Sequence, residues 1–264
     1  MKTSIWEKLR EKRRAKQLKN MKSVKKEYLL SDETPFNVTE SFRNIKASLS
    51  VSVAKKQGEG ISILVTSSFP EDGKTTISSN LALMFAHSNA KVLVVDADIR
   101  KGKIGKFFKS ESKPGLSDYL SGQATLEEIV RKTDVHENLY FIPCGTHSPK
   151  PYELLESERM KELSEELKAQ FDYVFFDTPP VLVVSDALAL APVVDGAVLV
   201  CRHLVSYVSD IEKSVNMLNF VKINILGTVI NDYQTQVDKY YGGREYYRKK
   251  GYYKKYGYSE KKKD

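Results

Sequence analysis

Residues 61–76 read ISILVTSSFPEDGKTT. Five of the first six are β-branched or apolar, which predicts a buried strand over Ile61–Thr66. The helical spacing of apolar residues over Thr75–His87 predicts a helix directly after the loop. A loop between a strand and a helix that ends in Gly73-Lys74-Thr75 is the context that a phosphate-binding loop requires. Its backbone N–H groups and the helix N-terminus present partial positive charge to phosphate.

The loop predicts specific contacts to a nucleotide. We expect Lys74 to reach the β- and γ-phosphates and the Thr75 hydroxyl to bind Mg²⁺. Ser68 stands where the general motif has its first glycine, so the match is imperfect and an unusual strand–helix turn is the alternative. The residues expected to line the nucleotide are Ser68, Pro70, Glu71, Asp72, Gly73, Lys74, Thr75 and Thr76.

Three carboxylates follow predicted strands. Residues 91–99 read KVLVVDADI and residues 173–180 read YVFFDTPP, which places Asp96, Asp98 and Asp177 at strand ends. In an open parallel sheet, ligands bind at the carboxyl ends of the strands. We therefore expect these acids to converge on the loop, where their hard oxygen atoms suit Mg²⁺. Each acid alone is more often a helix cap or a loop acid.

Strands and helices alternate along the rest of the core. This order predicts one α/β domain with a mainly parallel central sheet flanked by helices, a P-loop NTPase-like fold. The other expected strands are 91–95, 139–142, 173–176, 197–200 and 225–230, and the other expected helices are 38–53, 116–120, 126–130, 152–169, 185–190 and 206–220. We see no internal repeat.

The charge sits at the two ends of the 264-residue chain. The net charge is +8, but residues 1–30 alone hold eleven Lys/Arg and three Glu, and residues 232–264 hold ten Lys/Arg and five acids. The core between them is therefore acidic, and the basic balance belongs to the ends. We expect domains at 1–30 (a flexible basic arm), 31–231 (the nucleotide-binding domain) and 232–264 (a flexible tail).

Composition excludes several classes of protein. Hydrophobic residues make up 41% of the chain, which is enough for a core and excludes wholesale disorder. The two cysteines lie too far apart for a disulfide scaffold or a zinc cluster and fit a reducing compartment. Residues 1–30 lack the continuous apolar segment of a secretory signal. Acids and prolines interrupt the apolar run 173–201, so buried strands explain it better than a membrane span.

The predicted tail is rich in tyrosine. Nine of the 15 tyrosines lie in the last 33 residues, where Val237 is the only aliphatic residue. Without aliphatic side chains this segment cannot build a core. Two functional interpretations stay open on the residues alone: stacking on nucleic acid among basic side chains, and a set of phosphate acceptors. The basic arm is either a solvated segment or an amphipathic helix that contacts anionic lipid or a partner.

At this point the sequence resembles a known family. The stretches TSSFPEDGKTT, VVDADIRKGK and FFDTPP resemble the Walker A, second-Asp and Walker B motifs of the bacterial tyrosine kinases, and the resemblance covers roughly residues 38–264. It implies an ATP- and Mg²⁺-dependent protein-tyrosine kinase of capsule and exopolysaccharide assembly, similar to the separate cytoplasmic kinase subunit of Gram-positive systems. The implied acceptors, used in trans, are Tyr240, Tyr241, Tyr246, Tyr247, Tyr252, Tyr253, Tyr256 and Tyr258.

The resemblance also implies roles for single residues. Lys74 and Thr75 would bind phosphate and Mg²⁺, and Asp177 would hold the metal. Asp96 would be the catalytic base, and Asp98 would assist in positioning metal and substrate. Arg100 would support the phosphates or the loop, and Asn231 would contact adenine. The catalytic set is therefore Asp96, Asp98 and Lys74, and the metal set is Thr75, Asp98 and Asp177.

The helix before the core carries a further motif. Glu40, Arg43 and Lys46 resemble the family's E-x-x-R-x-x-R oligomerisation motif and lie one turn apart on one helix face. Lys46 replaces an arginine and so lacks its planar, bidentate fork. The resemblance implies a ring-like homo-oligomer, with an octamer as one form, in which a tail reaches the neighbouring active site. An ordinary solvated helix face is the alternative.

Two other functions remain as alternatives. Glu71 stands where the family usually has glycine, which favours a scaffold that binds nucleotide without transferring phosphate. The other is a positioning ATPase of the same superfamily, which would carry a second lysine early in the loop; this chain has Phe69 there, which argues against that function. The partners implied by the resemblance are an activating membrane adaptor (a polysaccharide co-polymerase subunit), a cognate tyrosine phosphatase and further copies of the chain. We expect no nucleic acid partner, and a cytoplasmic location at the inner face of the membrane.

Overall fold

The computed structural model describes residues 12–16, 29–53 and 59–233. At its centre lies a seven-stranded sheet with the order β3-β4-β2-β5-β1-β6-β7. All neighbouring strands run parallel except β3 and β4, which pair antiparallel at one edge. The strands are β1 (Ile61–Ser67), β2 (Val92–Asp96), β3 (Arg131–Lys132), β4 (Leu139–Ile142), β5 (Tyr173–Asp177), β6 (Gly196–Arg202) and β7 (Ile225–Asn231).

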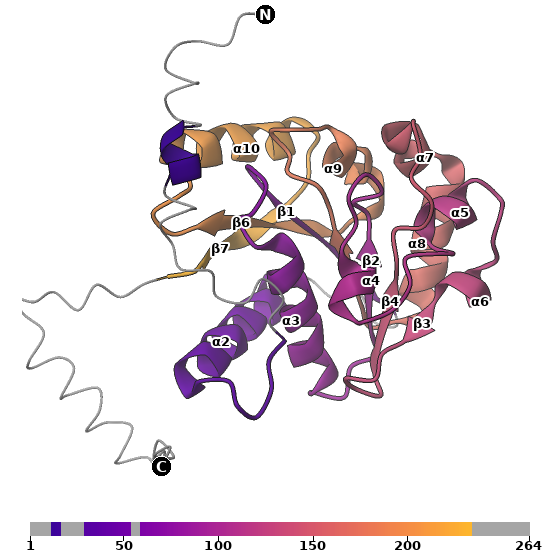
Figure 1. Cartoon of the computed structure of the whole chain (residues 1–264), viewed down its shortest axis with the longest axis horizontal. Coiled ribbons are helices and arrows are strands. Elements are labelled where there is room, and N and C mark those ends of the chain that lie inside the picture. Colours follow the sequence, from indigo (N-terminus) through magenta and orange to yellow (C-terminus); the bar gives the residue numbers. More distant parts are fainter. Residues whose placement is uncertain (1–11, 17–28, 54–58, 234–264) are drawn as a thin grey trace, which may run out of the picture. The chain divides into compact units, whose positions relative to one another are not determined.

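Helices cover both faces of this sheet (Figure 1). The long helices α2 (Phe36–Ser52) and α3 (Lys74–Ala86) pack on one face with the short α4 (Ile104–Phe107). Apolar side chains of the other helices pack on the opposite face. These helices are α5 (Leu116–Leu120), α6 (Leu126–Ile129), α7 (Pro151–Glu156), α8 (Glu158–Gln170), α9 (Asp186–Ala189) and α10 (Val208–Phe220), with the 3₁₀ turn η1 (Ala191–Val193).

Alternation along the central strands divides the core in two. In β1, Ile63 and Val65 pack towards α2 and α3, while Leu64 packs towards the opposite helices. In β5, Phe175 takes the first side and Phe176 the second. Because both faces are covered, these strands are continuously apolar rather than alternating apolar and polar, as parallel sheets require. The predicted fold class is confirmed.

The predicted elements appear close to their expected bounds, with informative exceptions. The expected helix 152–169 is wrong in one respect, because it breaks at Ser157 into α7 and α8. The Ser157 hydroxyl accepts a hydrogen bond from the Met160 amide and caps α8, and Ser is a favoured cap residue. The sequence analysis also missed α4 and β3, which are too short for a periodic pattern to reveal.

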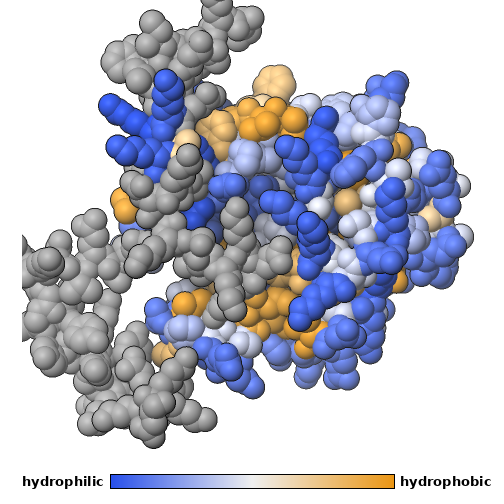
Figure 2. All heavy atoms as spheres, in the orientation of Figure 1, coloured by the Kyte–Doolittle hydropathy of each residue, from blue (hydrophilic) through white to orange (hydrophobic). Residues whose placement is uncertain are grey.

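The terminal segments lie largely outside the described residues. The compact unit that contains the sheet ends at Asn231, where we expect the domain to end. The eight predicted acceptor tyrosines and most of the basic arm lie outside the described residues. Among the described residues, no helix is long and apolar enough to span a membrane. On the face shown in Figure 2, hydrophilic side chains cover much of the described surface, with smaller hydrophobic areas between them.

Candidate active site

The loop between β1 and α3 has the shape of a phosphate cradle. Gly73 caps α3 with φ of 100°, a left-handed conformation that glycine adopts without steric cost. A Cβ atom at this position would lie 2.0 Å from Nδ2 of Asn231, so another residue would strain the backbone and displace the Asn231 amide. Lys74 follows as the first residue of α3 and is almost fully buried. The free N–H groups of the helix N-terminus therefore lie at the end of the loop, where a lysine also begins the helix.

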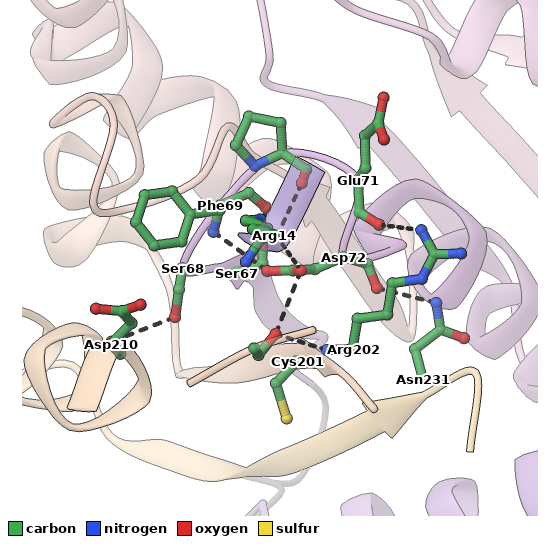
Figure 3. Close-up of polar contacts among 12 residues, drawn as sticks. Arg14, Ser67, Ser68, Phe69, Glu71, Asp72, Cys201, Arg202, Asp210 and Asn231 are labelled. Carbon is green, nitrogen blue, oxygen red and sulfur yellow. Dashed lines mark hydrogen bonds and ion pairs between the residues drawn. The ribbon is translucent and has the colours of Figure 1, made fainter. Parts of the chain in front are cut away.

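Neighbouring elements hold this loop from several sides (Figure 3). Asn231, at the end of β7, donates to the Asp72 carbonyl oxygen at 2.9 Å, and Arg202, at the end of β6, donates to the Glu71 carbonyl oxygen at 3.0 Å. The Ser68 hydroxyl lies 2.8 Å from that of Ser214 on α10. Sequence analysis missed Arg202 and Ser214. Arg202 could have been found, since it also stands at the carboxyl end of a strand.

These contacts refine two predictions. The Ser68 side chain is buried against α10, so only its backbone is free to take the predicted part in phosphate binding. The Asn231 amide binds the loop backbone, a buttressing contact that we did not predict, and its contact with adenine stays a prediction.

Two of the three predicted carboxylates meet beside the loop. Asp96 and Asp177 are register partners on the adjacent strands β2 and β5, and both are buried. Thr75 donates its hydroxyl hydrogen to Asp177 Oδ2 at 2.6 Å. The Ile104 amide donates to Asp96 Oδ2 at 2.9 Å. The predicted convergence is thus seen for Asp96 and Asp177, and Asp98 lies close enough to act on the pKa of Lys74 and Asp177.

The electrostatics of this cluster follow from burial. Burial lowers the pKa of Lys74, and the neighbouring Asp177, Asp98 and Asp72 act against that effect. Burial and the neighbouring Asp177 raise the pKa of Asp96 well above its usual value. Burial also raises the pKa of Asp177 to about 6, although Lys74 and Thr75 act in the opposite direction. Such strongly shifted groups are typical of functional sites.

The donor set fits a magnesium ion. Asp96 Oδ1 and Asp177 Oδ1 are buried and have no hydrogen-bond partner, which is costly unless a ligand supplies one. Carboxylate and hydroxyl oxygens are the donors that Mg²⁺ takes, usually with only one or two carboxylates plus substrate phosphates and water. Among the described residues, no three His, Cys, Asp or Glu side chains group as a metal site. The arrangement therefore suits a metal that arrives with phosphate.

The segment after β2 carries the remaining predicted residues. Asp98 is half-buried and its Oδ1 accepts from the Lys101 amide at 3.0 Å. Arg100 forms a bidentate pair with buried Asp186 of α9, at 2.6 and 3.0 Å. This pair ties the segment after β2 to α9, and the expected support of the phosphates or the loop by Arg100 stays a prediction. Sequence analysis missed Lys103, whose charge lies close enough to lower the pKa of both Lys74 and Asp177.

The departure at position 71 has a visible consequence. Glu71 adopts φ of 68°, in the left-handed region where a side chain costs roughly 1–2 kcal/mol and glycine costs almost nothing. The side chain itself is exposed. The loop therefore keeps the backbone conformation of a glycine although it carries a glutamate.

We expect Glu71→Gly to raise the free energy of unfolding by about 1 kcal/mol, because the substitution removes the Cβ that the left-handed backbone disfavours. Urea unfolding measures this change. Glu71→Ala is the matched control, since it removes the same charge but keeps the Cβ. Equal stabilisation by both variants would show that charge, and not backbone strain, is the cause.

Protonation of Asp177 predicts a pH-dependent stability. Its pKa rises from 3.8 to about 6 on folding, so the folded chain holds a proton that the unfolded chain has released. The stabilisation is present below about pH 4 and is lost as the pH rises through about 6. Above about pH 6, we expect the free energy of unfolding of nucleotide-free Asp177→Asn to exceed that of the wild type by up to about 3 kcal/mol. This difference should disappear below about pH 4. Urea unfolding across this pH range tests it, and a gap that does not change with pH would contradict it.

The predicted oligomerisation motif lies on α2. Arg43 pairs with Glu40 one turn away and is exposed, whereas Lys46 contacts the Ser88 hydroxyl of the same chain and lies over the Phe85 ring at 5.7 Å. The three residues therefore do not form one free face, because Lys46 is turned towards the end of α3. Arg43 is the most exposed member of the motif.

Known proteins share this sequence and fold. A family model described as an AAA domain matches residues 71–224. The tyrosine-protein kinase YwqD of Bacillus subtilis is 35% identical over 204 residues, which cover 77% of this chain and 85% of that protein. The chain spans a smaller part of other relatives: it is 33% identical to the tyrosine-protein kinase ptk of Acinetobacter johnsonii, over 74% of this chain but only 26% of that protein.

Solved structures of a tyrosine kinase domain and of a septum site-determining protein have a similar fold. The kinase domain of the Escherichia coli tyrosine kinase ETK has a TM-score of 0.69 at 30% identity, covering 83% of this chain and 88% of that one. The septum site-determining protein MinD from Pyrococcus horikoshii, solved in complex with Mg-ADP, has a TM-score of 0.57 at 26% identity, covering 66% and 71%.

Proposed function

The chain belongs to the AAA-domain proteins and, among them, to the bacterial tyrosine-protein kinases, and on that premise we propose that it transfers the γ-phosphoryl group of ATP to tyrosine. The observation that carries this proposal is the pair of buried, unpartnered carboxylate oxygens on Asp96 and Asp177 beside a glycine-capped phosphate loop. A phosphate-binding site alone would need neither oxygen. A site for a metal and a proton acceptor would use both.

The roles of the residues follow from phosphoryl-transfer chemistry, which needs alignment and charge neutralisation more than covalent help. The N–H groups of the first turn of α3 and the ammonium group of Lys74 bind the phosphate oxygens. Thr75, Asp177 and Asp98 would hold Mg²⁺, which supplies further positive charge to the phosphates when it is bound. The remaining loop residues, from Pro70 to Thr76, shape the cradle.

Asp96 serves as the base. The hydroxyl of a tyrosine has a pKa of about 10, so removing its proton during attack helps the reaction. Asp96 Oδ1 accepts that proton as the tyrosine oxygen bonds to phosphorus and the bond to ADP breaks. Since Gly102 lies against Asp96 Oδ2 and Asp96 is fully buried, the segment that carries Asp98 and Gly102 must move to admit a tyrosine.

We place the acceptors in the tail, at the eight tyrosines between Tyr240 and Tyr258. Nine tyrosines among basic residues and glycines give no core but suit an accessible acceptor segment. The proposed setting is capsule or exopolysaccharide assembly at the inner face of the membrane, with an activating membrane adaptor, a tyrosine phosphatase and a ring of copies that pack through Arg43 of α2.

Intact mass of the purified chain, after incubation with Mg²⁺ and ATP with and without the adaptor's cytoplasmic segment, tests the proposal. We expect several phosphate additions that map to Tyr240–Tyr258. ATP hydrolysis without any addition under either condition would instead favour a positioning ATPase. ATP binding without turnover would favour a regulatory scaffold.

A further inference from the structure

The short helix over residues 12–16 contacts the phosphate loop through one side chain. Arg14 Nη2 donates to Asp72 Oδ1 at 2.5 Å and to the Pro70 carbonyl oxygen at 3.1 Å. The same guanidinium lies 4.9 Å from the centre of the Phe69 ring. Arg14 therefore touches three of the four residues between Phe69 and Asp72 (Figure 3). Its side chain is only 12% exposed, whereas the neighbouring Arg13 is exposed.

Asp72 is the residue that gives this contact its importance. Its side chain is fully buried inside the loop and accepts hydrogen bonds from the Phe69 amide at 3.2 Å and the Ser206 hydroxyl at 3.3 Å. A carboxylate in this position fixes the shape of the loop. It also places a negative charge in the segment that must receive phosphate. Two negative charges repel each other more strongly in a buried site than in bulk water.

A cation beside Asp72 lets the carboxylate stay in the loop without repelling the phosphate. Arg14 neutralises the carboxylate, and its Nη2 donates both to the side chain of Asp72 and to the backbone of Pro70. A buried charge that loses its partner is strongly destabilised. Without Arg14, Asp72 would therefore either turn to solvent and release the Phe69 amide, or stay and repel the incoming phosphate.

We propose that Arg14 is a positioning residue for nucleotide binding, and that it ties the basic N-terminal segment to the affinity of the phosphate loop for ATP. The inference rests on the proposed ATP site. It assigns a function to part of the basic arm, for which sequence analysis offered only a solvated segment or a contact with lipid or a partner.

Calorimetric titration of the full chain with Mg-ATP tests the inference. We expect Arg14→Ala to weaken binding about tenfold, as for the loss of a charge-assisted hydrogen bond, and Arg14→Lys to weaken it less. Arg13→Ala is the matched control, because it removes the same charge from the same helix without a contact to the loop. Equal weakening by Arg13→Ala and Arg14→Ala would overturn the inference, since general charge would then explain the effect.

A double variant separates positioning from packing. Asp72→Asn removes the charge that Arg14 neutralises but keeps an oxygen that can accept from the Phe69 amide. If neutralisation is the role of Arg14, Asp72→Asn restores most of the affinity lost in Arg14→Ala. If Arg14 acts only by packing on Phe69, the double variant binds no better than Arg14→Ala, which would overturn the inference.

Hydrogen exchange of the nucleotide-free chain keeps this test independent of ATP binding. The Phe69 amide is bonded to Asp72 Oδ2, so we expect its exchange to accelerate about tenfold in Arg14→Ala and to stay unchanged in Arg13→Ala. A wild-type chain that fails to bind Mg-ATP would contradict the proposed function while this readout still decides on Arg14. Unchanged exchange in Arg14→Ala, together with an unchanged affinity for Mg-ATP, would overturn the positioning role.

Discussion

Replacing Lys74 with methionine is expected to lower the rate of tyrosine phosphorylation by about a thousandfold or more, because one preorganised charged contact to a transferring group contributes about 10²–10³ and this lysine also binds the substrate. Lys74 is the first residue of α3 and is almost fully buried next to Asp177. Methionine has a similar length and no charge, so it keeps the packing and removes the positive field at the phosphates.

The measurement is the initial rate of phosphotyrosine formation, together with a thermal melt. Folding should survive, since burying an ammonium costs free energy that methionine avoids. Lys161→Met, which removes a more exposed lysine from α8, serves as the control and should keep the wild-type rate. A Lys74→Met chain that keeps a tenth of the wild-type rate would contradict the role of Lys74.

Replacing Asp96 with asparagine is expected to have opposite effects on activity and stability. The rate of phosphotyrosine formation should fall by about 10²–10⁴, the range that general-base assistance supplies. The melting temperature of the nucleotide-free chain should rise by at least about 2 °C, or about 1 kcal/mol. The reason is that burial and Asp177 raise the pKa of Asp96, so its charged form is costly, while asparagine keeps the acceptor for the Ile104 amide.

Rates and thermal melts of Asp96→Asn and Asp134→Asn give the comparison. Asp134 is exposed between β3 and β4, so its replacement should change neither quantity much. A stabilised variant with full activity would show that Asp96 is not the base. An inactive variant with a lower melting temperature would show that Asp96 is needed for folding instead.

The sequence predicted the parts of the site that depend on strand ends. Apolar runs located β1, β2 and β5, and the rule that ligands bind at carboxyl ends then brought Asp96 and Asp177 together beside Lys74 and Thr75. Because register in a parallel sheet fixes which residues are neighbours, the pairing of Asp96 with Asp177 follows once the strands and their order are known.

Contacts between distant segments could not be predicted in this way. No periodic pattern connects Arg14 with Asp72, or Arg100 with Asp186, because each pair depends on the tertiary packing of segments that are far apart in the sequence. The left-handed backbone conformation at Glu71 could not be predicted either, because glutamate rarely adopts it. The contact of Lys46 with Ser88 could not be predicted either, because it depends on how α2 packs against the end of α3.

The most direct test of the kinase function mixes two variants of the chain. The donor has all eight acceptor tyrosines from Tyr240 to Tyr258 changed to phenylalanine, and the recipient carries Lys74→Met with an intact tail. After incubation with Mg²⁺, ATP and the adaptor segment, mass spectrometry locates phosphate. We predict phosphotyrosine between Tyr240 and Tyr258 of the recipient alone. ATP hydrolysis by the donor with no phosphate on either chain would contradict the account.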